Sequence, residues 1–254
     1  MKNRFWTIIT IVAVVTVMFW LRNWYRAPGL PTPPKLIVGT TPDYAPFTFK
    51  KGNEIVGFDI DLAREVAKQL GKEIEFKEMP FQLLITQAQE GGIQLIAAGI
   101  SSTPQRETLV TFTQPYITKD PLVVVYRTDS PRINSVKDLS GKTIIVNPGY
   151  TAENYFMQIP NITLERIPTI TEAAKKLISK KGDLFITTLS TLKPLLDQFG
   201  NTAFSFFIIN DVDENIALAI SPRYPNLVKD VNRIINELIA DGSVKKLREK
   251  WHLQ

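Results

Sequence analysis

The stretch Ile93-Gln-Leu-Ile-Ala-Ala98 is followed directly by Gly99-Ile-Ser-Ser-Thr-Pro-Gln-Arg106. Its first six residues form a short, almost wholly apolar run, which predicts a buried strand. A glycine ends the run, and the polar loop that follows carries a single arginine. In α/β sheets, ligands bind beyond the carboxyl ends of the strands. The stretch therefore predicts an α/β fold with a binding site at the end of this strand.

The chain on either side of this strand alternates short apolar runs with helical patterns, as α/β proteins do. The pattern is clearest over residues 59–70, where Ala63, Val66 and Leu70 share one helical face and Gly71 follows. Further helices are expected over residues 81–90, 169–179 and 227–240 and after residue 242. Further strands are expected over residues 36–38, 74–76, 122–126, 143–146, 184–186 and 216–220.

The composition is that of a folded globular protein. Of the 254 residues, 44% are hydrophobic and 22% are charged. The formal net charge of +5 comes mainly from residues 1–34, which hold four of the 30 basic residues and none of the 25 acidic ones. That leaves 26 bases against 25 acids in residues 35–254. Because nucleic-acid binding requires a strongly basic surface, no nucleic-acid partner is expected.

The lack of cysteine and the scarcity of histidine limit the chemistry. Without cysteine, the chain has no disulfide framework, thiolate metal site, cysteine nucleophile or lipid-modified cysteine. Its one histidine, His252, lies in the C-terminal tail, which argues against a catalytic triad or a multi-histidine metal site. We therefore expect no metal, no cofactor and no catalysis that depends on cysteine or on several histidines.

Residues 1–27 predict membrane targeting. Phe5–Leu21 contains no charged residue and, as a helix, would span about 25 Å, at the short end for a bilayer core. A cleaved signal peptide needs small residues before the cut, and Leu21–Arg26 offers none, so an N-terminal membrane helix acting as a signal-anchor is favoured over a signal peptide. Residues 28–34 form a Pro-rich spacer. The body is expected in the periplasm or another extracytoplasmic space, tethered to the inner membrane or released by cleavage.

Several motifs after residue 35 resemble a known family in their order and spacing. The most specific are YAPFTF at Tyr44–Phe49 and GFDIDLA at Gly57–Ala63. The others are Ala98–Ser101 (AGIS), Thr103–Arg106 (TPQR), Phe112–Tyr116 (FTQPY) and Val136–Lys142 (VKDLSGK). Over about 220 residues, the chain resembles the periplasmic amino-acid-binding proteins of polar amino acid ABC importers.

The resemblance implies a two-lobed α/β fold, the type II periplasmic-binding-protein fold, in which two crossing strands form a hinge. Lobe 1 would comprise residues 35–118 and 216–254, and lobe 2 residues 119–215. The implied function is capture of a small-molecule ligand between the lobes and its delivery to an ABC transporter permease. An amino acid is expected, with basic or polar ones such as arginine as candidates, and the lobes would close around it.

The resemblance assigns the ligand's α-carboxylate to Arg106, because a planar guanidinium can hold a carboxylate through two parallel hydrogen bonds. Ala98, Gly99 and Ser101 would bind beside it through their backbone groups and the serine hydroxyl. From position alone, a surface arginine paired with Glu107 or with nothing would be the favoured interpretation of Arg106.

Tyr44 and Phe81 resemble the family's aromatic pair, which sandwiches the ligand side chain, although simple core packing would also explain them. Thr151 follows residues 148–150 at the start of an expected helix. The resemblance assigns it a ligand contact, because backbone N–H groups at a helix start attract a carboxylate. The alternative is that Thr151 only caps the helix.

Two positions depart from the family pattern. Where the family has an aspartate that binds the ligand's ammonium group, this chain has Thr188, which is also expected to bind ligand. A second neutral residue, Thr41, replaces an acid or amide. Neutral hydroxyls do not supply the charge that an ammonium group prefers. Either an acid elsewhere compensates or the ligand is not an ordinary α-amino acid. The candidate acids are Asp43, Asp213 and Glu214.

Two other functions stay open at this point. Some proteins of this fold are dehydratases that act on cyclic carboxylic acids, and Glu153 or Glu214 would then supply the acid. The chain could also be a ligand-sensing domain that signals through another chain.

Overall fold

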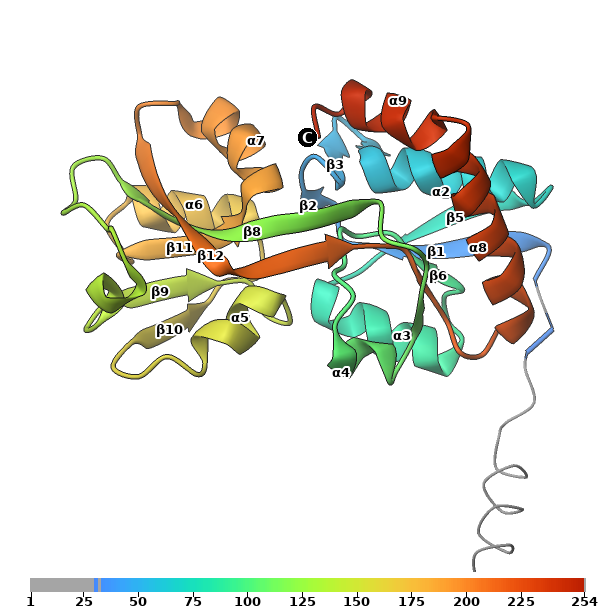
Figure 1. Cartoon of the computed structure of the whole chain (residues 1–254), viewed down its shortest axis with the longest axis horizontal. Coiled ribbons are helices and arrows are strands. Elements are labelled where there is room, and N and C mark those ends of the chain that lie inside the picture. The colour runs from blue at the N-terminus through green and yellow to red at the C-terminus, as the bar shows by residue number, and fades with distance from the viewer. Residues whose placement is uncertain (1–29, 32, 254) are drawn as a thin grey trace, which may run out of the picture.

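The computed structural model describes residues 30–31 and 33–253, which form two α/β lobes side by side (Figure 1). The expected membrane helix lies outside the described residues. Within them, no helix has both the length and the apolar character needed to cross a membrane. The expectation of a two-lobed α/β architecture is confirmed.

Lobe 1 is built on a five-stranded sheet of order β5-β1-β6-β13-β7, in which β1 runs parallel to both of its neighbours. The strands are β1 (Lys35–Thr40), β5 (Glu73–Glu78), β6 (Leu95–Ile96), β7 (Thr111–Phe112) and β13 (Ala219–Ile220). A small second sheet contains β2 (Asp43–Tyr44), β3 (Thr48–Lys51) and β4 (Glu54–Val56).

Helices cover both faces of the lobe 1 sheet (Figure 1). One group contains α2 (Phe58–Gln69), α8 (Pro225–Ala240) and α9 (Ser243–Lys250). The other contains the 3₁₀ turn η1 (Phe81–Leu83), α3 (Leu84–Glu90) and α4 (Pro104–Glu107). α2 starts after Gly57, whose φ is 135° and whose added Cβ would lie 2.2 Å from the carbonyl oxygen of Phe47. Only glycine allows the helix to begin this close to the Phe47 carbonyl, because residues with a side chain rarely adopt such a φ.

Lobe 2 has a five-stranded sheet of order β10-β9-β11-β8-β12. Its strands are β8 (Ile117–Arg127), β9 (Thr143–Val146), β10 (Thr163–Arg166), β11 (Leu184–Thr188) and β12 (Phe204–Ile216). Its helices are η2 (Val136–Leu139), α5 (Thr151–Phe156), α6 (Ile170–Ile178) and α7 (Leu189–Phe199). β9, β10 and β11 are parallel, and β8 is antiparallel to β11.

Two long antiparallel strands, β8 and β12, connect the lobes (Figure 1). At their lobe 1 end Ile117 faces Ile216, and at their lobe 2 end Arg127 faces Phe204. The register shifts twice along the pair, on either side of residues 213–214. A pair of extended strands is the kind of connection about which two lobes can rotate.

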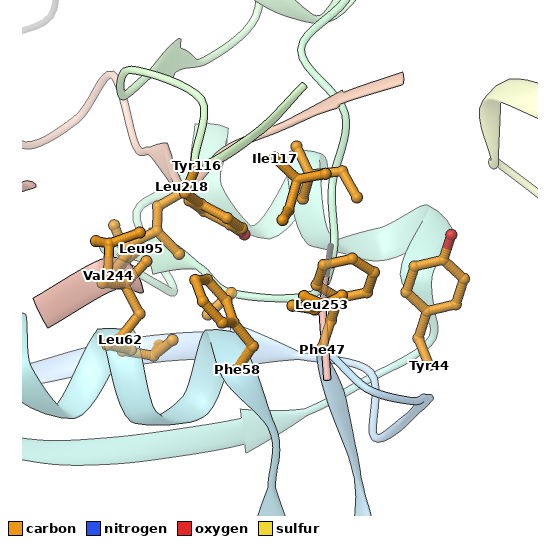
Figure 2. Close-up of a cluster of buried hydrophobic side chains, with 14 of the residues drawn as sticks. Tyr44, Phe47, Phe58, Leu62, Leu95, Tyr116, Ile117, Leu218, Val244 and Leu253 are labelled. Carbon is orange, nitrogen blue, oxygen red and sulfur yellow. The ribbon is translucent and has the colours of Figure 1, made fainter. Parts of the chain in front are cut away.

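The core of lobe 1 is a cluster of aromatic and aliphatic side chains that fills the space between the sheet and its helices (Figure 2). Phe47 and Phe58 are fully buried in it, and Leu253 brings the end of the chain into the same cluster. Tyr44 lies at one edge of the row in Figure 2. The same buried cluster continues into lobe 2 through residues such as Val125.

Three predicted elements differ from the observed ones. The strand expected over residues 93–98 is only Leu95–Ile96, because it pairs with β1 at just two positions. The strand expected over residues 216–220 is divided, since Ile216 ends β12 and Ala219 begins β13. The helix expected over residues 81–90 begins as a 3₁₀ turn and becomes α-helical only at Leu84.

Candidate functional site

The loop after β6 is held by a buried carboxylate. Gly99 has a φ of 61°, and its N–H donates to Asp59 Oδ2 at 2.8 Å. Tyr116 donates from its hydroxyl to Asp59 Oδ1 at 2.7 Å. Burial raises the pKa of Asp59 to about 7, although hydrogen bonds from the backbone of Gly99 and Ala98 and from Tyr116 oppose the shift. An added Cβ on Gly99 would lie 2.5 Å from the Tyr44 ring, so only glycine lets the loop pass this close.

Arg106 lies where the two lobes meet. α4 positions it, and Thr103 caps that helix by accepting the Arg106 N–H at 3.2 Å. The side chain is 7% exposed, which excludes the surface alternative, and Glu107 accepts a hydrogen bond from Ser102 instead.

The Arg106 guanidinium contacts residues of both lobes. Nη1 donates to the carbonyl of Ser101 in lobe 1 and Nη2 to the carbonyl of Gly149 in lobe 2, both at 2.8 Å. The group also lies over the Phe81 ring, 5.4 Å from its centroid. Burial lowers the pKa of Arg106, while the nearby charge of Glu214 raises it. The guanidinium stays protonated, because arginine does not lose its proton in proteins. Within the described chain it is a buried cation that carbonyl oxygens hold and no salt bridge neutralises.

The predicted aromatic pair, Tyr44 and Phe81, has a third ring packed on it. Tyr150 of lobe 2 lies edge-on to Tyr44, with ring centroids 5.3 Å apart, and tilted against Phe81 at 4.1 Å. The cavity left beside these rings has a volume of only about 10 Å³, about what one water molecule needs. Tyr150 therefore fills space between the lobes that an amino acid would have to enter.

Sequence reasoning missed the part that Tyr150 plays. The sequence pattern at residues 148–151 indicates backbone groups at a helix start. An aromatic residue next to a glycine does not indicate that its ring reaches the other lobe. Tyr150, not Thr151, is the N-cap residue of α5, and Thr151 is the first residue of the helix. The expected alternative of Thr151 as a cap is therefore wrong. Its hydroxyl donates instead to the carboxylate of Glu214.

Thr188 and Thr41 differ in their positions. Thr188 ends β11 and caps α7 in a capping box with Thr191, while its hydroxyl lies 3.4 Å from that of Tyr44 in the other lobe. Thr41 is turned away, because its hydroxyl donates to the carbonyl of Met79 at 2.8 Å. The structure thus brings Thr188 to the space between the lobes and keeps Thr41 out of it.

The three acids considered as compensating groups lie in different environments. Asp213 is exposed. Asp43 bridges the lobes, because its carboxylate accepts the N–H of Ile170 at 2.5 Å and the hydroxyl of Thr171 at 2.8 Å, at the start of α6. Burial raises the pKa of Asp43, and these hydrogen bonds oppose the shift. The carboxylate of Asp43 thus already has hydrogen-bond donors at the start of α6.

Glu214 is the acid of the three that is buried between the lobes. It lies on β12 and is 6% exposed. Ser101 donates to its Oε2 at 2.5 Å, and Thr151 donates to its Oε1. Burial raises its pKa to about 7, against the effects of the Ser101 hydrogen bond and the Arg106 charge. The structure therefore brings Ser101, Arg106 and Thr151 together around one carboxyl group.

A fourth acid, Asp120, was not predicted from the sequence as a site residue. It lies on β8 directly opposite Glu214 and is 4% exposed. Its Oδ1 accepts the N–H of Ser190 at 2.9 Å, while its Oδ2 is buried without a hydrogen-bond partner among the described residues. Burial raises its pKa, and hydrogen bonds from Ser190 and Thr188 oppose the shift. An acid two residues before the apolar run 122–126 was the signal available in the sequence.

Of the other expected site residues, Ala98 is fully buried and packs with Phe81 in a small lobe 1 cluster. Its methyl group is thus part of the core, and only its backbone lies at the loop that leads to Ser101. Glu153, the other acid considered for catalysis, accepts the N–H of Gly149 and pairs with Arg166 near the surface.

Comparisons with known proteins agree with this architecture. The family model described as bacterial extracellular solute-binding proteins, family 3, matches residues 36–254. The arginine-binding extracellular protein ArtP of Bacillus subtilis (strain 168) is 32% identical over 222 residues, which cover 85% of this chain and 86% of that protein.

Solved structures extend the likeness. An ancestral arginine-binding protein bound to glutamine superimposes with a TM-score of 0.81 at 30% identity, over 88% of this chain and 100% of that one. The ancestral amino acid-binding protein AncCDT-1, a precursor of cyclohexadienyl dehydratase, gives a TM-score of 0.76 at 30% identity, over 86% of this chain and 95% of that one.

Proposed function

Because the chain belongs to family 3 of the bacterial extracellular solute-binding proteins, we propose that it captures an amino acid between its lobes and delivers it to an ABC transporter permease. The observation that carries the amino-acid assignment is Arg106, a buried guanidinium that both lobes contact through carbonyl oxygens. Glu214 lies near this cation but forms no salt bridge with it among the described residues, so a ligand carboxylate could form the direct bidentate pair that the guanidinium lacks.

The same contacts suggest how binding closes the lobes. The Arg106 Nη2 donor now points to the Gly149 carbonyl of lobe 2. When the lobes separate, this donor is released and Tyr150 leaves the rings of Tyr44 and Phe81. A ligand carboxylate then takes the free donors of Arg106, its side chain lies against the two rings, and Ser101 and Thr151 contact its polar groups. Closure of lobe 2 buries the ligand.

In this proposal lobe 1 comprises residues 35–118 and 216–254, and lobe 2 comprises residues 119–215. The strands β8 and β12 act as the hinge. Residues 1–27 hold the protein at the outer face of the inner membrane, or direct its export if they are cleaved. The binding protein meets its permease there and performs no catalysis.

The proposal can be tested by thermal unfolding of the full chain in a mild detergent. The panel contains each common L-amino acid, ornithine and several carboxylates without an amino group, at 1 mM. A ligand with a Kd near 1 μM adds about 4 kcal/mol of stability. For a protein of this size that raises the Tm by roughly 8–16 °C. A shift with at least one amino acid is expected, and no shift with any of them would refute the proposal.

Variants of Arg106 test the carboxylate contact. Arg106→Ala should abolish binding, and Arg106→Lys should weaken it strongly, because an ammonium group cannot form two parallel hydrogen bonds to one carboxylate. Arg132→Ala, which removes an exposed arginine, is the matched control and should bind as the unchanged protein does. Equal affinity in all three variants would remove Arg106 from the site.

One observation favours a second function. Glu214 is a buried carboxyl group whose pKa is raised to about 7, which is the property of a general acid at neutral pH. It would protonate the departing hydroxyl group of a cyclohexadienyl carboxylate, so that this group leaves as water while the ring carboxylate leaves as carbon dioxide. The electron pair of the broken carbon–carboxylate bond completes the aromatic ring, which absorbs ultraviolet light. Turnover of such a compound, lost in Glu214→Gln, would establish this alternative; absence of any absorbance change would exclude it for that compound.

A further inference from the structure

Two carboxyl groups face each other across the strands that join the lobes. Asp120 of β8 and Glu214 of β12 are directly opposed in the antiparallel pair, so their side chains leave the ribbon on the same face. Glu214, Tyr44 and Thr188 line one small cavity, and Thr188 pairs with Leu122, two residues along β8 from Asp120. Asp120 and Glu214 therefore belong to one acidic subsite beside Thr188.

The subsite has more acceptor capacity than the described chain uses. Asp120 Oδ2 is buried without a donor, although an oxygen in that position normally has one. Among residues 30–31 and 33–253, Glu214 accepts hydrogen bonds from the hydroxyls of Ser101 and Thr151, and no cation forms a salt bridge with it. Two other acids nearby already have hydrogen-bond donors, the buried Asp59 from the Gly99 loop and the half-buried Asp43 from the start of α6.

Two carboxylates buried next to each other are unfavourable, and the single positive charge of Arg106, which forms no salt bridge with them among the described residues, offsets only one of them. We propose that Asp120 and Glu214 together bind the ammonium group of the ligand, in place of the aspartate that this chain lacks at Thr188. This inference rests on the proposed amino-acid-binding function and assigns a part of the site that the comparisons do not. The hydroxyls of Tyr44 and Thr188 line the same subsite.

The charge of the closed site indicates which amino acids it prefers. Arg106 contributes one positive charge, and ionised Asp120 and Glu214 contribute two negative charges, so the three groups sum to −1. A zwitterionic amino acid leaves this charge unchanged, whereas one with a cationic side chain brings it to zero. Because uncompensated charge is costly in a buried site, L-arginine and L-lysine should bind more tightly than L-glutamine.

The test is isothermal titration calorimetry of the full chain with L-arginine, L-lysine and L-glutamine. Asp120→Asn and Glu214→Gln each remove one charge and keep the shape of the side chain. Each should weaken L-arginine binding by about 10- to 100-fold, the usual effect of losing a hydrogen bond to a charged group. The double variant should also lose most of the preference for L-arginine over L-glutamine. Asp213→Asn, which neutralises the exposed neighbour on β12, is the matched control.

Stability separates a binding role from a structural one. Without ligand, neutralising two buried acids should raise the Tm at pH 8, while binding becomes weaker. A structural role would lower the Tm instead, and a lower Tm with unchanged affinity would overturn the proposal. If a variant does not fold, the unchanged protein still gives an answer. An ammonium group placed beside Glu214 lowers its pKa, so L-arginine binding near pH 7 should release protons, measured by titration in buffers of different ionisation enthalpy.

The outcomes distinguish this inference from the proposed function. If the unchanged chain binds L-arginine and Arg106→Ala does not, but Asp120→Asn and Glu214→Gln bind like the unchanged chain, the ammonium subsite is refuted and the amino-acid receptor stands. If no amino acid binds to the unchanged chain, both fail. Weaker binding in both acid variants and in Arg106→Ala, with Asp213→Asn unaffected, supports both.

Discussion

Asp43 is the residue whose loss should most directly favour the open arrangement of the lobes. It extends from β2 of lobe 1 to the first N–H groups of α6 in lobe 2, which have no partner within their own helix. Its carboxylate also accepts the Thr171 hydroxyl at 2.8 Å. Opening of the lobes breaks these bonds, so they stabilise only the closed arrangement.

The magnitude follows from the contacts. Two short hydrogen bonds to a charged acceptor contribute about 1.5–3 kcal/mol each. The raised pKa of Asp43 shows that burial of the carboxylate offsets part of this gain. A net loss of about 2 kcal/mol in Asp43→Ala corresponds to about 30-fold weaker ligand binding. Most of the change should appear as faster dissociation, because association starts from the open lobes.

The assay is stopped-flow tryptophan fluorescence with the amino acid identified by thermal unfolding. Asp197→Ala is the control. Asp43 and Asp197 both line a groove between the lobes, but within the described chain the ion pair of Asp197 is with Lys193 of its own helix. Thr171→Val in the background of Asp43→Ala should add little, since its partner is already lost. Dissociation of Asp43→Ala at the unchanged rate would refute the argument that this contact holds the lobes together.

Three further predictions concern the residues around the site. Tyr150→Thr should strengthen binding of the identified amino acid about threefold in calorimetry, because no ring has to leave the space between the lobes; weaker binding would mean that the ring contacts the ligand. Gly99→Ala should abolish binding and lower the Tm, since the added methyl group meets Tyr44; a normal Tm with normal affinity would contradict the described loop. Because the pKa of Asp59 is about 7 in the folded chain and 3.8 in its ordinary state, folding takes up a proton between these values. The contribution of Asp59 to stability should therefore be greatest below pH 4, fall by about 4 kcal/mol as the pH rises towards 7 and then level off. Asp59→Asn should remove most of this slope in denaturant titrations at pH 5 and pH 8, and an unaltered slope would assign it to other groups.

The parts of the fold that depend on local pattern could be predicted from the sequence. The helical face that begins at Phe58 and the capping of α6 by Thr169 follow from spacing and residue type within a few positions. Gly99, Ser101 and Arg106 are close in sequence and belong to the loop after β6 and the short helix α4 that follows it, so their proximity was also predictable. Whether they bind ligand stays a prediction.

The remaining parts depend on contacts between distant segments. Nothing in the sequence around Tyr150 indicates that its ring packs on Phe81 of the other lobe. Asp120 and Glu214 become neighbours only through the register of β8 and β12, which two irregularities interrupt. Sequence periodicity does not indicate the register between strands so far apart in the chain. The acidic subsite therefore could not be predicted from the sequence.

The order of strands in lobe 1 also determines when that lobe can be completed as the chain emerges. β13 lies between β6 and β7, although all residues of lobe 2 separate it from them in sequence. The strands of lobe 2, by contrast, follow one another without interruption from Ile117 to Ile216. During synthesis or export, the sheet of lobe 2 therefore has all its strands before the sheet of lobe 1 does. One edge of β6 stays unpaired until Ala219 has been made or exported. A chain arrested before that residue would contain every strand of lobe 2 and only an open fragment of lobe 1, the half that carries Arg106.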